Sequence, residues 1–105
     1  IVNILSIAVS DIFTGNSLYS ASKSAVSTMM KVLREELRED GVDVVNVYPG
    51  ATSTDLWPDD LRKEHENKMM LPEDVAAAIL PAIEAITEQR TTIEEIILRP
   101  KQGNI

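Results

Sequence analysis

Tyr19 and Lys23 stand four residues apart in a segment with helical spacing, which places a phenol and an ammonium on one face of a helix. A free phenol has a pKa of about 10 and is a poor base near neutral pH. A neighbouring ammonium favours the phenolate, so the tyrosine becomes a useful proton donor and acceptor. Ser6 adds a hydroxyl that can hydrogen-bond a carbonyl oxygen as negative charge develops on it. These groups suit the interconversion of a carbonyl and an alcohol, and since none of them carries a hydride, a cofactor is implied.

The same residues also have structural interpretations. The sequence holds two tyrosines among 105 residues, and a tyrosine four residues before a lysine arises readily by chance. Such a pair fits a half-exposed helical tyrosine packed on a lysine stem, and Ser6 fits a polar strand end. His65 is the one histidine and has no cluster of acidic ligands at metal-binding spacing, so we expect a packing or surface role for it and no metal site.

The hydrophobic spacing predicts strands that alternate with helices. Residues 1–7 and 42–47 are short apolar runs, typical of strands buried on both faces of a parallel sheet. The predicted order is strand 1–7, helix 18–40, strand 42–47, helix 59–70, helix 72–87 and strand 93–98. Connections that contain helices imply right-handed crossovers, so we predict an α/β fold with a doubly wound parallel sheet. A complete sheet of this kind needs on the order of 150 residues or more, so we expect the sequence to be part of a longer chain.

The helix predicted over residues 18–40 follows a polar loop, in which Asn16 or Ser17 is the expected cap. Gly41 is the expected left-handed stop, and Pro81 is expected to kink or split the later helix. The apolar row of the 18–40 helix consists of Ala25, Met29, Leu33 and Leu37. Its solvated face is predicted to carry Lys31, Arg34, Glu35, Arg38 and Glu39.

The composition excludes several classes of protein. Ten basic and 17 acidic residues give a net charge of −7, which argues against nucleic acid and anionic membrane surfaces as partners. The sequence has no cysteine, so it offers neither a disulfide nor a thiolate zinc site. It also has no apolar run of about 18 residues, so no membrane-spanning helix is predicted. We therefore expect one domain at most and a cytoplasmic location.

The residues that could do chemistry are predicted to meet at one edge of the sheet. Ser6 ends the first strand, and Tyr19 and Lys23 lie in the first turns of the helix that follows. The polar segment 49–54 leaves the second strand. Ligands bind at the carboxyl ends of the strands in open α/β sheets, so we expect these groups to face one crevice.

Three sequence strings carry a family resemblance: NILSIA at residues 3–8, YSASKSAV at residues 19–26 and VNVYPGATST at residues 45–54. In this order and at this spacing they resemble the classical branch of the short-chain dehydrogenase/reductase family. The resemblance covers residues 1–105, aligned with the C-terminal half of a family member. It implies a single Rossmann-like domain whose N-terminal cofactor-binding half lies outside this sequence. It also implies an oxidoreductase that uses NAD or NADP to interconvert a carbonyl and an alcohol.

The resemblance assigns catalytic roles to three residues. Tyr19 would be the acid and base of the reaction. Lys23 would favour its phenolate and would also hold the ribose hydroxyls of the nicotinamide nucleotide. Ser6 would orient and polarise the carbonyl of the substrate.

The resemblance also assigns binding roles. Pro49, Gly50 and the backbone near Thr52 would line the nicotinamide pocket, and Thr54 would contact the carboxamide or phosphate side of the cofactor. The lid over the substrate would comprise Leu56, Trp57 and residues 59–70. Trp57 fits substrate contact and simple lid packing equally well.

Two interpretations of the function stay open. The first is the oxidoreductase, with a small-molecule carbonyl or alcohol as substrate. The second is a truncated, non-catalytic half-domain that serves as an oligomerisation or binding module, because the glycine-rich phosphate turn and the catalytic asparagine of the family lie outside residues 1–105. The family usually dimerises through the helix at residues 18–40, so we expect a homo-oligomer built on that helix. The identity of the substrate, the choice between NAD and NADP and the direction of reaction are not encoded in these motifs.

Overall fold

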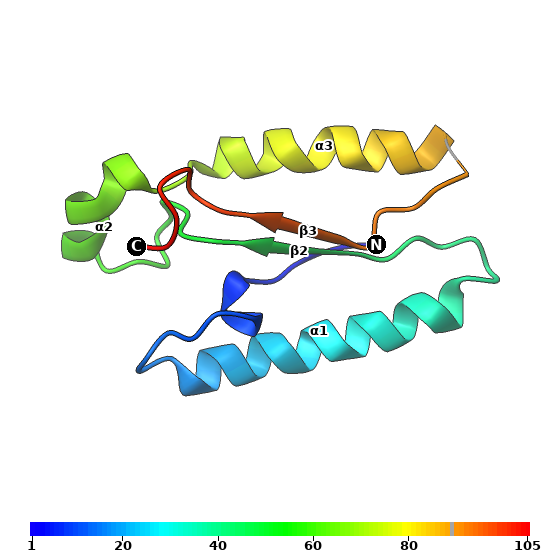
Figure 1. Cartoon of the computed structure of the whole chain (residues 1–105), viewed down its shortest axis with the longest axis horizontal. Helices are drawn as coiled ribbons and strands as arrows, with labels where there is room; N and C mark the ends of the chain where they lie inside the picture. The colour runs from blue at the N-terminus through cyan, green and yellow to red at the C-terminus, as the bar shows by residue number, and fades with distance from the viewer. Residues whose placement is uncertain (89) are drawn as a thin grey trace.

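The computed structural model describes residues 1–88 and 90–105 of the chain. Its three strands form one parallel sheet in the order β1, β2, β3 (Figure 1). The strands are β1 (Val2–Ile4), β2 (Val45–Pro49) and β3 (Glu95–Leu98). The parallel direction and the helical crossovers confirm the predicted α/β class, a Rossmann-like fragment.

Helices cover both faces of this sheet, which is the arrangement of a doubly wound fold (Figure 1). Helix α1 (Ser17–Leu37) lies on one face and α3 (Pro72–Glu88) on the other. The short helix α2 (Asp59–His65) and the 3-10 turn η2 (Glu66–Lys68) lie beyond the carboxyl ends of the strands. The helices described over residues 1–88 and 90–105 include none that is long and apolar enough to cross a membrane.

The first strand is shorter and more exposed than its apolar sequence predicts. We expected residues 1–7 to be buried on both faces, and this was wrong for the strand itself, because Ile4 is 50% exposed. Among the described residues β1 pairs only with β2, so it forms an edge of the sheet. The chain leaves the sheet after Ile4 and enters the 3-10 turn η1 (Ile7–Val9), so the burial moves to Leu5 and Ile7.

The ends of α1 agree with the sequence in part. Gly41 adopts a φ of +70°, which confirms the predicted left-handed conformation, but the helix ends at Leu37 and not at the predicted residue 40. Asn16 stands at the cap position, but its side chain forms no capping hydrogen bond with the described residues. The predicted apolar row divides, because Met29 is 56% exposed while Leu33 is partly buried.

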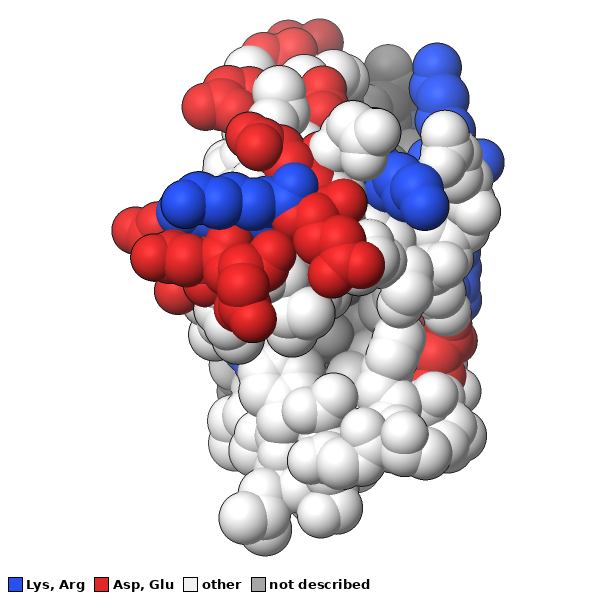
Figure 2. Space-filling view, turned by 90° about the vertical axis from the view of Figure 1, so that its left-hand side faces the viewer, with Lys and Arg blue, Asp and Glu red and all other residues white. Residues whose placement is uncertain are grey.

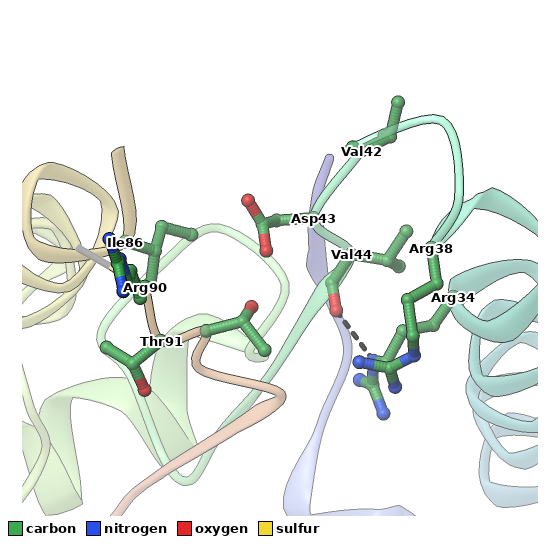
Figure 3. Close-up of a pocket in the computed structure, with 10 residues that line it drawn as sticks. Arg34, Arg38, Val42, Asp43, Val44, Ile86, Arg90 and Thr91 are labelled. Atoms are coloured by element: carbon green, nitrogen blue, oxygen red, sulfur yellow. Dashed lines mark hydrogen bonds between the residues drawn. The ribbon is translucent and has the colours of Figure 1, made fainter. Parts of the chain in front are cut away.

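Arg34 contradicts the prediction of a solvated position. Its side chain is buried between α1 and the sheet, where Nε donates a hydrogen bond to the Val44 carbonyl at 2.8 Å (Figure 3). Its Nη2 donates to the Glu94 carbonyl at 2.5 Å. The guanidinium thus links the segments that lead into β2 and β3, because five donors on a rigid plane can reach two carbonyls at once.

The later helices also correct the sequence expectations. Pro81 neither splits α3 nor ends it, since the helix runs unbroken from Pro72 to Glu88. Proline in a helix removes one N–H donor, and at this exposed position α3 continues past the missing bond. The helix expected over residues 59–70 ends at His65, and Met70 instead forms an isolated parallel bridge with Thr52.

A buried hydrogen-bond chain fixes α1 on the sheet. Ser27 of α1 and Tyr48 of β2 are buried, and their hydroxyl oxygens lie 2.8 Å apart. Asn46, which is fully buried, donates from Nδ2 to the Tyr48 hydroxyl at 3.3 Å and accepts from Asn3 Nδ2 at 3.3 Å. A buried polar network that is satisfied in this way specifies one arrangement of its elements. It therefore sets where the first turns of α1 lie relative to the strand ends.

Candidate active site

A cavity of about 700 Å³ lies at the carboxyl ends of the strands. Its volume is in the range usual for small-molecule sites. Eight of the nine predicted site residues line it, namely Ser6, Tyr19, Pro49, Gly50, Thr52, Thr54, Leu56 and Trp57. The ninth, Lys23, lies beside Tyr19 and outside the lining. The topology therefore brings together residues that are up to 51 positions apart, from Ser6 to Trp57.

Ser6 is oriented by the turn that begins at it. The residue is extended, with φ −163° and ψ 151°, and caps η1. Its Oγ accepts a hydrogen bond from the Ala8 N–H at 3.1 Å. A serine hydroxyl has one O–H donor and two acceptor positions, so this contact leaves the O–H free to donate. Ser6 can thus donate a hydrogen bond into the cavity, as polarisation of a carbonyl requires.

Tyr19 and Lys23 share one face of α1, as their spacing predicts. The Lys23 ammonium nitrogen lies 5.8 Å from the centre of the Tyr19 ring, within the range of a cation–π contact. Tyr19 is 36% exposed, which leaves its ring accessible to a ligand in the cavity. The site thus places a phenol in the cavity lining and an ammonium over its ring.

The segment after β2 supplies hydrogen-bonding hydroxyls to the cavity and is closely packed at Gly50. A Cβ added to Gly50 would come within 3.1 Å of Pro100 Cδ and 3.3 Å of the Leu98 carbonyl oxygen, so the packing there favours glycine. Thr52 Oγ1 donates to the Gly50 carbonyl at 3.0 Å, which leaves its oxygen free to accept. Thr54 Oγ1 accepts from the Leu56 N–H at 3.4 Å, which leaves its O–H free to donate.

A match to a family model identifies the family of this chain. The family model described as short chain dehydrogenase matches residues 1–65, more than half of the chain. The chain belongs to the short chain dehydrogenase family. Sepiapterin reductase of Chlorobaculum tepidum is 36% identical over 102 residues, which are 97% of this chain and 41% of that protein.

Solved structures with lower sequence identity to this chain share its fold. The crystal structure of BdcA in complex with NADPH superposes with a TM-score of 0.77 at 23% identity, over 99% of this chain and 46% of that one. The structure of 4-hydroxyisoleucine dehydrogenase complexed with NADH and succinate gives a TM-score of 0.74 at 22% identity, over 97% and 46%. This short chain dehydrogenase chain thus spans less than half the length of the relatives it matches.

The cavity of this short chain dehydrogenase also has walls that the sequence did not reveal. Asn16, which stands at the cap position of α1, also lines it, and so does Phe13 from the same loop. Asn104 and Ile105 reach it from the far end of the sequence. The loop could have been suspected because it lies between Ser6 and Tyr19. No local pattern marks residues 104 and 105, because long-range contacts bring them to the cavity.

Charge is unevenly distributed around the cavity. None of the described residues that line it is acidic or basic. In contrast, Figure 2 shows acidic side chains gathered over α2, above the part of this face that carries few charges. Within α2, Arg62 Nη1 donates to Asp55 Oδ1 at 2.6 Å and so ties the segment with Leu56 and Trp57 to the helix. The site therefore combines a neutral interior with a negatively charged rim.

Proposed function

We propose that the protein is an NAD(P)-dependent oxidoreductase that interconverts a carbonyl and an alcohol, with Tyr19 as the proton donor and acceptor. The observation that carries this proposal is the shared cavity, in which Ser6 and Tyr19 both line the carboxyl-end crevice while Lys23 stands 5.8 Å from the Tyr19 ring. Membership of the short chain dehydrogenase family supports the same reaction class.

The residues present suit a nicotinamide nucleotide. Pro49 and Gly50 give a flat, uncharged surface, and Thr52 and Thr54 offer one free acceptor and one free donor, which matches the two hydrogen-bonding atoms of a carboxamide. BdcA and 4-hydroxyisoleucine dehydrogenase, which share the fold, are complexed with NADPH and NADH respectively. When bound, such a cofactor supplies or accepts the hydride that no side chain can carry.

The side chains of this protein then bind the carbonyl oxygen of the substrate and transfer a proton to it. In the reducing direction, Ser6 donates a hydrogen bond to that oxygen from the hydroxyl that Ala8 leaves free. Tyr19 gives its phenolic proton to the same oxygen as negative charge develops there. The Lys23 ammonium stabilises the phenolate that remains. In the oxidising direction the same groups act in reverse, and the phenolate accepts the proton of the alcohol.

The proposal is tested by turnover in the intact protein that carries this sequence. We expect consumption of NADH or NADPH that depends on an added neutral ketone such as acetophenone, followed by absorbance of the reduced nicotinamide. Mass spectrometry should identify the matching alcohol as the product. Neither cofactor being consumed with any of a panel of ketones, nor reduced with the matching alcohols, would contradict the proposal.

Replacing Lys23 by methionine should lower kcat about 100-fold, because the phenolate loses its neighbouring cation. Methionine keeps much of the unbranched stem that packs along α1, so the fold should persist. Arginine at the same position should restore part of the loss, since it returns a positive charge. Steady-state kinetics of the three proteins measures this, and equal rates for the methionine variant and the parent would show that the cation plays no part.

A second proposal concerns association between copies of this protein. The exposed side of α1 carries Leu18, Ala25, Met29 and Val32, which are spaced by seven, four and three residues and form one stripe. We propose that this stripe packs against the same stripe of a second copy in a symmetric pair. The binding-module interpretation of the chain needs the same surface, and the enzyme is compatible with it.

Met29→Glu should weaken this association at least about tenfold, because it places a charge at the centre of an apolar contact. Sedimentation equilibrium of the intact protein measures the change. Glu36→Gln, on the same helix and also exposed, serves as the control and should leave the association unchanged. If the parent protein is monomeric at all concentrations, the proposal is wrong.

A further inference from the structure

The segment that follows β3 is fastened to the loop that follows Ser6. Arg99 donates two hydrogen bonds to Asp11, from Nη1 to Oδ2 at 2.5 Å and from Nη2 to Oδ1 at 3.0 Å. Asn104 donates from Nδ2 to Asp11 Oδ2 at 2.7 Å and accepts from Arg99 Nη1 at 2.9 Å. The three side chains therefore form a closed triangle between positions that are 88 and 93 residues apart. We call them the tail clamp.

Asp11 is itself held in place by the turn η1. Its backbone N–H donates to the Ile7 carbonyl at 2.8 Å, and the Ser10 hydroxyl donates to Asp11 Oδ1 at 3.0 Å. The hydrogen bonds from Arg99 and Asn104 hold the pKa of the Asp11 carboxyl well below its usual range. The carboxylate therefore stays ionised throughout the pH range of ordinary assays. Because Ser6 caps the same turn, the tail clamp joins the segment that follows β3 to the segment that positions the Ser6 hydroxyl.

The clamped tail forms part of the cavity. Asn104 lines it, as does the adjacent Ile105, together with Tyr19, Leu56 and Trp57. Gly103 adopts a φ of +85°, and its N–H donates to the Pro100 carbonyl at 2.8 Å, so this turn and the bonds from Asn104 to Asp11 and Arg99 together place residues 103–105. The position of this wall thus depends on three polar side chains, of which only Asn104 lines the cavity.

We propose that Asp11 and Arg99 are positioning residues that hold Asn104 and Ile105 as a wall of the substrate pocket, and that this wall selects uncharged carbonyl compounds with an apolar body. This inference rests on the proposed oxidoreductase function. It names the substrate class of that site and the residues that define its outer side.

The chemistry of the wall supports an uncharged, apolar substrate. Ile105 offers apolar surface, and the guanidinium of Arg99 is committed to Asp11 and Asn104. A carboxylate in this part of the cavity would lose its hydration without meeting a cation among the described lining residues. The acidic side chains gathered over α2 would also repel an anion that approaches from that side (Figure 2).

The test compares two ketones that differ by one carboxylate, acetophenone and benzoylformate, in the intact protein. We expect the parent to prefer acetophenone in kcat/KM. Arg99→Ala should raise the KM for acetophenone about tenfold while kcat changes less than about threefold, because the wall is lost and the reacting groups remain. The preference over benzoylformate should shrink accordingly. Arg38→Ala is the matched control, since Arg38 is also paired with carboxylates, Glu35 and Glu94, but lies at the opposite end of the sheet.

A rescue variant separates positioning from a general loss of structure. Asp11→Arg combined with Arg99→Asp exchanges the two charges, and the Asn104 amide can turn over to present its oxygen to residue 11 and its NH₂ to residue 99. We expect the double variant to regain at least half of the lost discrimination. The proposal would be overturned if Arg99→Ala kept the KM of the parent. It would also be overturned if the loss of kcat/KM in the double variant equalled the product of the losses in its two single variants.

A readout that needs no turnover distinguishes this inference from the function on which it rests. Hydrogen exchange of residues 100–105 should become at least about tenfold faster in Arg99→Ala and stay at the parental rate in Arg38→Ala. Quenching of Trp57 fluorescence by acetophenone should weaken in the first variant only. If the protein turns over no ketone, these two effects still support the tail clamp as a binding wall. If exchange is unchanged, the tail clamp is wrong even in an active enzyme.

Discussion

Tyr19→Phe should abolish turnover, with a fall in kcat of about 1,000-fold or more and little change in the free energy of unfolding. The substitution removes the phenolic proton donor and keeps the ring that Lys23 contacts. General acid–base catalysis contributes about 10² to 10⁴ to a rate, and the cavity offers no other ionisable side chain among its described lining residues to replace it. Since Tyr19 is 36% exposed, its hydroxyl does not carry a buried hydrogen bond whose loss would destabilise the fold.

Tyr48→Phe provides a control of the same chemistry at the other tyrosine of the sequence. The Tyr48 hydroxyl is buried, 2.8 Å from Ser27 Oγ and 3.3 Å from Asn46 Nδ2. Its loss should lower the free energy of unfolding by about 1–2 kcal/mol and leave kcat within about threefold of the parent. Urea unfolding and steady-state kinetics of both variants measure this crossed pattern. Near-parental kcat in Tyr19→Phe would rule out Tyr19 as the acid and base.

The sequence predicts the candidate site well because local motifs carry its chemistry. Tyr19 and Lys23 lie about one helical turn apart, and Ser6 and Gly50 each lie just after the end of a strand. Once the strands are known to be parallel, their carboxyl ends must lie at one edge. The placement of Ser6, Tyr19 and Gly50 around one cavity therefore follows from spacing and topology, without any knowledge of side-chain packing.

The parts that the sequence does not predict depend on contacts between distant segments. Asn104 is held at the cavity by the ion pair between Arg99 and Asp11, which lie 88 residues apart. No local sequence pattern near either residue predicts that they pair. Helical periodicity placed Arg34 among solvated charges because it considers one helix at a time. The structure buries Arg34 because its guanidinium donates to two backbone carbonyls of the sheet segments, those of Val44 and Glu94, which no helical pattern records.

Arg34→Met should lower the free energy of unfolding by about 3 kcal/mol. The side chain is 7% exposed, and its two hydrogen bonds, to the Val44 and Glu94 carbonyls, are both made by a charged donor. Hydrogen bonds of that kind contribute about 1.5–3 kcal/mol each. The buried Val44 carbonyl would lose its donor and keep the cost of desolvation, whereas the Glu94 carbonyl would keep the Asn46 N–H as a donor. Methionine preserves the apolar stem, so the measured loss reports the hydrogen bonds rather than a cavity. Chemical denaturation of the intact protein gives the value.

Arg38→Met is the control for this prediction, because Arg38 lies one turn further along and lines the same small cavity (Figure 3). Its guanidinium pairs with Glu35 and Glu94 at the surface, where ion pairs contribute little to stability. We expect its unfolding midpoint to stay close to that of the parent. Arg34→Lys should recover less than half of the loss at position 34, because an ammonium is a point donor and does not match two carbonyls that a planar guanidinium spans. Equal stabilities for Arg34→Met and Arg38→Met would mean that the buried arginine does not tie the strand segments together, and that the sheet holds them without it.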